Sequence, residues 1–359
     1  MTQSPPNKKG RILSGARPTG KLHLGNYVGA LRNWVNLQSD YDCFFFIADW
    51  HALTTDYADT NSIKQNSLEV MIDYLAAGLD PERSTLFIQS HVPQHAELYL
   101  LFGMITPLGW LERVPTYKEQ RENIRDKDLS TYGFLGYPLL QSADILMYQA
   151  DFVPVGEDQV PHVELTREVA RRFNQFYPRR VTPGARDPQR LTVFPEPKPL
   201  LTPAAKLPGT DGRKMSKSYG NTILLSEPEQ SLRMKLKTMV TDPARVRRSD
   251  PGNPDVCPVG DLHKIFSSSD TMAKVYEGCR TAGIGCIECK KWAADSFWDV
   301  LKPIQERRAI YETNPKLAWD ILEAGSSKAR LAAEATMDEA RAAANLSYEY
   351  EPPRPGGES

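Results

Sequence analysis

Residues 11–48, RILSGARPTGKLHLGNYVGALRNWVNLQSDYDCFFFIA, alternate between apolar runs of strand length and a stretch with helical spacing. The first half of the chain keeps this βαβαβ order, with strands expected at 11–14, 43–48 and 85–89 and helices at 25–37 and 61–77. Parallel strands need helical crossovers, and strands buried on both faces are apolar throughout. The sequence therefore predicts an α/β fold with a Rossmann-like parallel sheet that binds a nucleotide.

The rest of the chain changes to a mostly helical pattern. The elements expected in its middle part are helices at 137–148 and 160–173 and, within a proline-dense loop at 178–208, a short strand at 191–194. After Ser226 the helical pattern continues almost to the end. We therefore expect two domains, a Rossmann-like domain with a helical insertion at 1–226 and a helical domain at 227–359.

Composition and charge limit the classes of protein to which the chain can belong. Its 359 residues are 40% hydrophobic and 25% charged, which is typical of a globular protein. The formal net charge is −1, so a nucleic-acid partner would have to contact local basic patches rather than a uniformly positive surface. The chain has no apolar run of about 18 residues, as a membrane helix requires, and its N-terminus lacks a signal peptide's apolar core. We expect a cytoplasmic protein that does not enter membranes.

The first candidate nucleotide-binding segment is SGARPTGKLHLGN at 14–26, which follows a strand and leads into a helix. A glycine such as Gly25 lets the backbone approach a nucleotide closely, and a helix N-terminus directs N–H groups at phosphates. A plain strand-to-helix turn has the same composition, so this segment by itself does not distinguish the two interpretations.

A second candidate segment, GRKMSKS at 212–218, follows the proline-dense loop. Its lysines, Lys214 and Lys217, can place two ammonium groups on a departing pyrophosphate. A basic loop alone is usually solvated surface, but the two segments in this order strongly favour nucleotide chemistry.

Together the two segments resemble the signature motifs of class I aminoacyl-tRNA synthetases, His-Ile-Gly-His and Lys-Met-Ser-Lys-Ser. The second motif matches at every position from Lys214 to Ser218. The first motif is His23-Leu-Gly-Asn here and differs at Leu24 and Asn26. Asparagine at its fourth position is common among the tryptophan enzymes of this class.

The amino-acid substrate is indicated by a polar stripe on one expected helix. Tyr137, Gln141 and Asp144 lie one turn apart on a single face, among apolar neighbours. A buried carboxylate needs partners, and an indole N–H is a donor that tyrosine lacks. Downstream, VPVGEDQ at 153–159 resembles the tryptophanyl-tRNA synthetases, whereas tyrosine enzymes generally have Gly-Gly-x-Asp-Gln there. This resemblance extends from about residue 11 to about residue 346.

The resemblance implies a reaction and a set of site residues. The chain would activate L-tryptophan with Mg-ATP, release pyrophosphate, and transfer tryptophan to the 3′ end of tRNA(Trp) with release of AMP. The implied ATP contacts are Arg17, Pro18, Thr19, Gly25, Asn26, Gly156, Glu157, Asp158, Lys214, Met215, Ser216, Lys217 and Ser218. The implied catalytic groups are Lys214, Lys217, His23 and Asn26. The implied tryptophan site has Asp144 on the indole nitrogen, Tyr137 and Gln159 near the ammonium group, and Gln141 in the pocket wall.

The resemblance also implies that residues 1–226 are catalytic, that residues 227–359 bind the anticodon, and that two chains form a homodimer. Three other functions remain open at this point: a tyrosyl-tRNA synthetase, a small-molecule adenylyltransferase, and a non-enzymatic paralogue. The long helical second half argues against an adenylyltransferase, and the intact Lys-Met-Ser-Lys-Ser motif argues against a non-enzymatic protein.

Four of the five cysteines are close in sequence, with the pattern C-x21-C-x6-C-x2-C. They are Cys257, Cys279, Cys286 and Cys289. In a reducing compartment such a group favours one tetrathiolate metal site over disulfides. Four thiolates suit either zinc or a [4Fe–4S] cluster, so the ligands do not choose the metal. The resemblance implies a [4Fe–4S] cluster, because a subset of bacterial tryptophanyl-tRNA synthetases carries one with nearly this spacing.

Overall fold

The computed structural model describes residues 8–123, 127–202 and 207–348 and confirms the predicted α/β fold. Five parallel strands form one sheet in the order β3-β2-β1-β4-β5. The strands are β1 (Arg11–Ala16), β2 (Asp42–Ile47), β3 (Ser84–Ile88), β4 (Phe152–Val155) and β5 (Lys198–Leu201). Because the strands are parallel, their carboxyl ends meet along one edge. The strand order reverses between β1 and β4, which is where open α/β sheets bind ligands.

The side chains of β2 show why it lies inside the sheet. Phe45 is buried in the core on one face, whereas Phe44 and Phe46 are buried in a second core on the other face. Alternate residues of a strand point to opposite faces, so a strand with this sequence needs cover on both. The strands predicted at 11–14, 43–48 and 85–89 agree with β1, β2 and β3 to within two residues.

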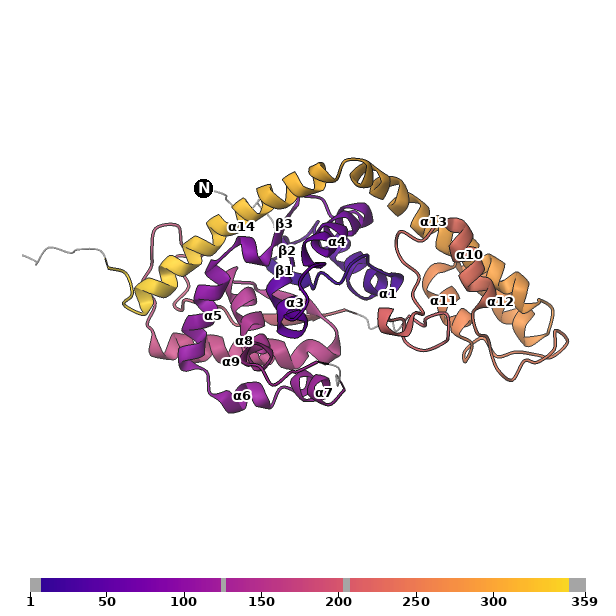
Figure 1. Ribbon diagram of the computed structural model, residues 1–359, viewed down its shortest axis with the longest axis horizontal. Coiled ribbons are helices and arrows are strands. Elements are labelled where there is room, and N and C mark those ends of the chain that lie inside the picture. The colour runs from indigo at the N-terminus through magenta and orange to yellow at the C-terminus, as the bar shows by residue number, and fades with distance from the viewer. Residues whose placement is uncertain (1–7, 124–126, 203–206, 349–359) are drawn as a thin grey trace, which may run out of the picture.

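Helices cover both faces of the sheet (Figure 1). In the first part of the chain they are α1 (Leu24–Asn26), α2 (Arg32–Leu37), α3 (Asp49–Asp56), α4 (Ile63–Ala77), α5 (Gln94–Ile105), α6 (Leu108–Glu112), α7 (Pro115–Asn123), α8 (Tyr132–Met147) and α9 (Val160–Phe176). The helix predicted at 25–37 is present, with a π-helical turn at Tyr27–Leu31 between α1 and α2. The helices predicted at 61–77, 137–148 and 160–173 correspond to α4, α8 and α9.

The strand predicted at 191–194 is wrong. These residues form bends, and the edge strand β5 follows at Lys198–Leu201. Phe194 is instead packed against Phe102 and Phe173, with ring centroids 5.3 and 4.8 Å apart. Its apolar character therefore reflects packing into the core rather than pairing in the sheet.

The second half of the chain is helical, as predicted. The helices α10 (Glu229–Thr238), α11 (Pro258–Phe266), α12 (Ser269–Arg280) and α13 (Cys286–Thr313) lie together at one end of the molecule (Figure 1). From there α13 leads into α14 (Pro315–Ala343), which crosses back over the sheet. A Cβ at Gly325 would lie 1.9 Å from the Leu86 carbonyl oxygen, so α14 touches the backbone of β3. The predicted division at 226/227 groups α14 with the second domain, whereas this helix packs on the sheet of the first. None of the helices in the described ranges is both long and apolar enough to cross a membrane.

Candidate active site

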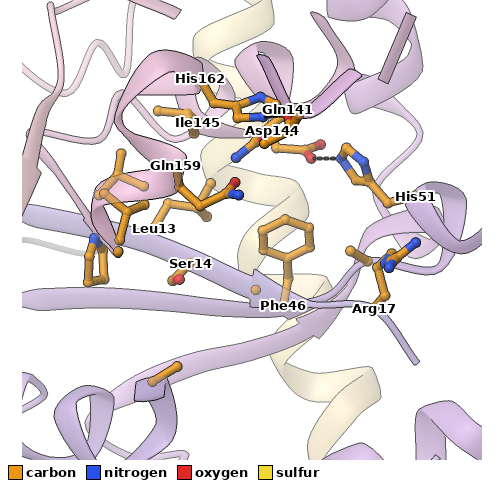
Figure 2. A pocket seen from close by; sticks show the side chains of 18 of the residues that line it. Leu13, Ser14, Arg17, Phe46, His51, Gln141, Asp144, Ile145, Gln159 and His162 are labelled. Atoms are coloured by element: carbon orange, nitrogen blue, oxygen red, sulfur yellow. Dashed lines mark hydrogen bonds and ion pairs between the residues drawn. The ribbon is translucent and has the colours of Figure 1, made fainter. Parts of the chain in front are cut away.

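A cavity of about 420 Å³ opens at the carboxyl edge of the sheet, where β1 and β4 end (Figure 2). Its lining residues are Leu13, Ser14, Gly15, Arg17, Gly29, Ala30, Trp34, Phe46, Ala48, His51, Thr54, Thr116, Gln120, Tyr137, Gln141, Asp144, Ile145, Val153, Pro154, Val155, Gly156, Gln159, His162 and Thr202. Apolar side chains from the strand ends meet polar side chains from the helices. Such a wall with a few converging polar groups is typical of a small-molecule site.

Asp144, on α8, lies at the centre of a buried hydrogen-bond network and is 1% exposed. Gln89 Nε2 donates to its Oδ1 at 2.7 Å, and His95 Nδ1 bonds the same oxygen at 2.6 Å. His51 Nε2 lies 2.7 Å from Oδ2, and Figure 2 shows this bond. An ionised carboxylate only accepts hydrogen bonds, so both histidines present an N–H to it. His95 Nε2 then accepts from the Tyr148 hydroxyl at 2.8 Å.

These donors determine the charge of Asp144. Burial raises the pKa of its carboxyl, but the hydrogen bonds from His51 and His95 lower the pKa by more, to about 2. The group is therefore ionised at neutral pH. Oδ1 accepts from two side chains and Oδ2 from one, so Oδ2 is the oxygen better placed to accept from a molecule in the cavity.

The polar stripe predicted on one helix face is present on α8. Tyr137, Gln141 and Asp144 all line the cavity. The Tyr137 hydroxyl lies 2.8 Å from Thr116 Oγ1, which is 2.6 Å from His162 Nε2. Burial raises the pKa of Tyr137, so its hydroxyl stays protonated and can donate.

The segment after β4 turns along the cavity. Gly156 and Gln159 line it, and Glu157–Gln159 form a 3₁₀ turn that leads into α9. A Cβ at Gly156 would lie 2.7 Å from Asp158 Oδ1, so glycine makes room for that carboxylate. The side chains of Glu157 and Asp158 are exposed and do not line the cavity.

The segment after β1 borders the cavity through its first residues. Arg17 lines it, whereas Pro18 and Thr19 do not. The carbonyl of Thr19 accepts a hydrogen bond of 2.6 Å from Lys217 Nζ. Desolvation by the surrounding protein lowers the pKa of Lys217, although the side chain keeps contact with solvent. The structure thus connects the two candidate nucleotide segments directly.

His23 and Asn26 form the turn that begins α1. The His23 N–H donates to Asn26 Oδ1 at 3.0 Å. A Cβ at Gly25 would lie 2.9 Å from the His23 ring, so the glycine is needed for this turn. Burial and then the charge of Lys217 lower the pKa of His23 to about 4, which leaves the imidazole neutral at pH 7.

The Lys-Met-Ser-Lys-Ser segment packs against this turn. The Leu24 N–H donates to the Ile223 carbonyl at 2.9 Å, and buried Met215 lies beside Gly25. The other residues of the motif, Lys214, Ser216, Lys217 and Ser218, stay accessible to solvent. The motif residues border the cavity region without lining the cavity itself.

The four clustered cysteines line one small cavity in the helical end of the molecule. It is lined by Cys257, Cys279, Cys286 and Cys289 together with Thr241, Asp242, Arg245, Val259 and Ile284. Arg245 lies 3.9 Å from Cys279 Sγ, and His263 Nε2 lies 3.4 Å from Cys289 Sγ. Over the described ranges, no three His, Cys, Asp or Glu side chains are arranged to hold a metal ion as they stand. The fold therefore gathers the four thiols but does not present a formed metal centre.

The sequence interpretation missed the partners of Asp144. It treated this residue as a buried carboxylate in need of donors, but it assigned no role to His51, Gln89 or His95. His51 and Gln89 follow the carboxyl ends of β2 and β3. That position at the binding edge of a parallel sheet is the signal that points to them.

Comparison with known proteins gives matches along almost the whole chain. The family described as tRNA synthetases class I (W and Y) matches residues 5–302. The tryptophan–tRNA ligase of Thermotoga maritima is 53% identical over 340 residues, covering 94% of this chain and 100% of that protein. That of Ralstonia nicotianae is 51% identical over 397 residues, covering 94% and 99%. The tryptophanyl-tRNA synthetase structure of Campylobacter jejuni, complexed with ADP and tryptophan, has a TM-score of 0.80 at 32% identity and covers 94% and 100%.

Proposed function

Because the chain belongs to the class I tRNA synthetases for tryptophan and tyrosine, we propose that its cavity binds tryptophan against Asp144 and activates it with ATP. The chain is an aminoacyl-tRNA ligase, a tryptophan–tRNA ligase, with 51–53% identity to named tryptophan–tRNA ligases over their whole length. This function replaces the three alternatives that the sequence left open, which were a tyrosyl-tRNA synthetase, a small-molecule adenylyltransferase and a non-enzymatic paralogue.

The ionised Asp144 is the observation that carries the assignment of the tryptophan site. Its Oδ2 is the oxygen better placed to accept, and an indole N–H is a neutral donor that fits a buried anion without adding charge. Tyr137 and Gln159 line the same cavity and supply polar atoms for the ammonium and carboxylate groups. Gln141 forms part of the wall beside the indole.

Tryptophan activation needs no general base, because the attacking carboxylate is already ionised at neutral pH. The carboxylate attacks the α-phosphorus of Mg-ATP, and pyrophosphate leaves with its negative charge increasing. We expect Lys214 and Lys217, from the Lys-Met-Ser-Lys-Ser motif, to supply the positive charge that stabilises it. Neutral His23 contributes an N–H rather than a charge, since its pKa is lowered to about 4. Arg17, at the cavity wall, adds a third cation near the phosphates.

Transfer to tRNA(Trp) is proposed to use both parts of the chain. The terminal ribose hydroxyl attacks the adenylate at the cavity, and the helical end contacts the anticodon. Exposed basic side chains surround that end, including Arg247, Arg248, Arg280 and Lys291. A local basic patch of this kind suits an RNA backbone. The cytoplasm, where tRNA is charged, is the proposed location.

A [4Fe–4S] cluster is proposed at the four cysteines, with Zn²⁺ as the alternative. Four thiols around one cavity are the donor set of either centre, and Arg245 beside Cys279 can offset the negative charge of thiolates. When bound, the metal centre would tie α11, α12 and α13 together. Anaerobically purified protein should then contain four irons per chain and absorb broadly at about 400 nm. One zinc and no colour would select the alternative, and absence of both metals would reject the site.

A homodimer is proposed through an exposed apolar surface of the helical insertion. Leu100 and Met104 on α5 are 58% and 71% exposed, and Tyr132 at the start of α8 is 67% exposed. A Cβ at Gly103 would lie 3.9 Å from the Tyr132 hydroxyl, so the start of α8 lies beside α5. Exposed apolar patches of this kind mark interfaces, and a second copy of the chain is the partner of choice in closed symmetric assemblies.

The experiment that tests the function is amino-acid-dependent exchange of pyrophosphate into ATP. Exchange should require tryptophan and should be far slower with tyrosine. Charging of tRNA(Trp) should follow in the same preparation. Equal exchange with tyrosine would reject the assignment of the cavity.

A further inference from the structure

The backbone of Leu22, one residue before His23, is held from two directions. Its N–H donates to Asp73 Oδ2 at 2.6 Å. Its carbonyl accepts from the Leu225 N–H at 2.9 Å. The turn from His23 to Asn26 therefore starts from a backbone position that α4 and the segment after Lys-Met-Ser-Lys-Ser fix together.

Both supports of Leu22 are bound by the helix α13. Asp73 is fully buried on α4 and forms an ion pair with Arg308, whose side chain is 2% exposed. Gln305, one turn earlier on α13, donates to the Leu225 carbonyl at 3.3 Å and to the Glu227 carbonyl at 2.6 Å. Arg308 and Gln305, one turn apart on α13, thus bind the two groups that hold the Leu22 backbone.

Arg308 has two further partners, which fix the position of its guanidinium group. It forms an ion pair with Glu69 on α4, and its Nε donates to Glu312 at 2.8 Å. Burial raises the pKa of Asp73 to about 6, and the positive charge of Arg308 opposes that rise. A buried ion pair contributes little net stability compared with an apolar replacement, so we attribute to it a geometric role, which the hydrogen bond from Leu22 to Asp73 supports.

The helix α13 connects the cysteine cavity with the residues that hold Leu22. The helix begins at Cys286, beside the cysteine cavity, and ends at Thr313, just after Arg308. Neither Asp73, Gln305 nor Arg308 lines the active-site cavity. They are therefore positioning residues rather than catalytic ones.

We propose that Asp73, held by Arg308, and the Leu225 backbone, held by Gln305, together position the His23–Asn26 turn for ATP, so that adenylate formation requires α13 to be seated against α4. The proposal rests on the proposed function, because it takes His23 and Asn26 as part of the ATP site. It predicts that loss of the Asp73 charge slows adenylate formation from ATP. Tryptophan binding should be unaffected, because Asp144 and its donors lie on other elements.

The test uses the full-length protein and tryptophan-dependent pyrophosphate exchange. Asp73→Asn keeps the size of the side chain and an oxygen acceptor but removes the charge. We expect kcat to fall by roughly 10-fold or more, with the KM for tryptophan within about twofold of wild type. The matched control is Glu312→Gln. Glu312 binds the same Arg308 but is 46% exposed, does not contact Leu22, and reaches the neighbouring Lys21 only through an exposed ion pair of 3.8 Å; its kcat should stay within about twofold.

Three further variants keep the proposal testable if Asp73→Asn folds poorly. Arg308→Gln should lower kcat in the same way, and Arg308→Lys should restore part of the loss because it keeps the charge. Gln305→Ala, which removes only two hydrogen bonds to carbonyls, should lower kcat less and without a change in the KM for tryptophan. Circular dichroism and thermal melting identify variants that are not folded.

The outcomes separate this proposal from the proposed function. If the wild-type protein shows no tryptophan-dependent exchange, the function itself is wrong. If the wild-type protein is active and the folded Asp73, Arg308 and Gln305 variants all keep kcat within about twofold, only the positioning role is wrong. An equal loss in Glu312→Gln would also overturn it, because the effect would then not pass through Leu22.

Discussion

Replacement of Asp144 by asparagine should reduce kcat/KM for tryptophan by roughly 10- to 150-fold. The carboxylate accepts from two donors at Oδ1 and one at Oδ2. An asparagine can satisfy Gln89 and His95 only by turning its oxygen toward them, which points its NH₂ group at His51 and the indole N–H. The hydrogen bond from the indole N–H to a charged group is then lost, at a cost of about 1.5–3 kcal/mol, which gives the range above.

The assay is pyrophosphate exchange as a function of tryptophan concentration, with the same series in tyrosine. Discrimination against tyrosine should fall in Asp144→Asn, because the lost acceptor is the one proposed to receive the indole N–H. Asp56→Asn is the control, since Asp56 is a carboxylate of α3 with a side chain 39% exposed and lies outside the cavity lining. If the folded Asp144→Asn protein kept kcat/KM for tryptophan within about twofold, Asp144 would not be the indole acceptor.

Three further predictions follow from the site and the surfaces. Lys217→Ala should lower kcat for adenylate formation with little change in the KM for ATP, because the lysine acts on charge that develops in the transition state; a higher KM at unchanged kcat would make it a ground-state ligand. Cys286→Ser should lose bound metal measured by elemental analysis, whereas Cys43→Ser, in β2 and far from the cysteine cavity in sequence and fold, should keep it; equal metal content in both would remove Cys286 from the ligands. Leu100→Asp combined with Met104→Asp should shift sedimentation from dimer to monomer at micromolar concentration, and an unchanged dimer would place the interface elsewhere.

The sheet was predictable because its strands carry their own signal. An apolar run such as residues 43–47 can be stable only where both faces are covered, and the structure buries Phe44, Phe45 and Phe46 on alternate sides. The edge strand β5 was not predictable in this way. The residues of β5 are exposed or only partly buried. Val193 and Phe194, which precede β5, are buried and are of residue types more typical of strands.

The site was predictable where spacing along one helix sets the geometry. Tyr137, Gln141 and Asp144 line one cavity because a helix returns to the same face every three or four residues. The donors to Asp144 come from separate elements, and no local spacing connects them to α8. His95 is completely buried on α5, so its contact with Asp144 depends on tertiary packing.

The origin of these donors bears on how the enzyme can select tryptophan. His51, Gln89 and His95 belong to three different elements, and each is fixed by its own packing before any ligand enters. An amino acid whose ring brings no donor to Oδ2 leaves that ionised oxygen with His51 as its one hydrogen-bond partner among the described residues. A site built to accept one hydrogen bond in this way can reject analogues by roughly 10⁴-fold. If Asp144 accepts the indole N–H as proposed, binding alone selects tryptophan, and a separate editing activity is unnecessary.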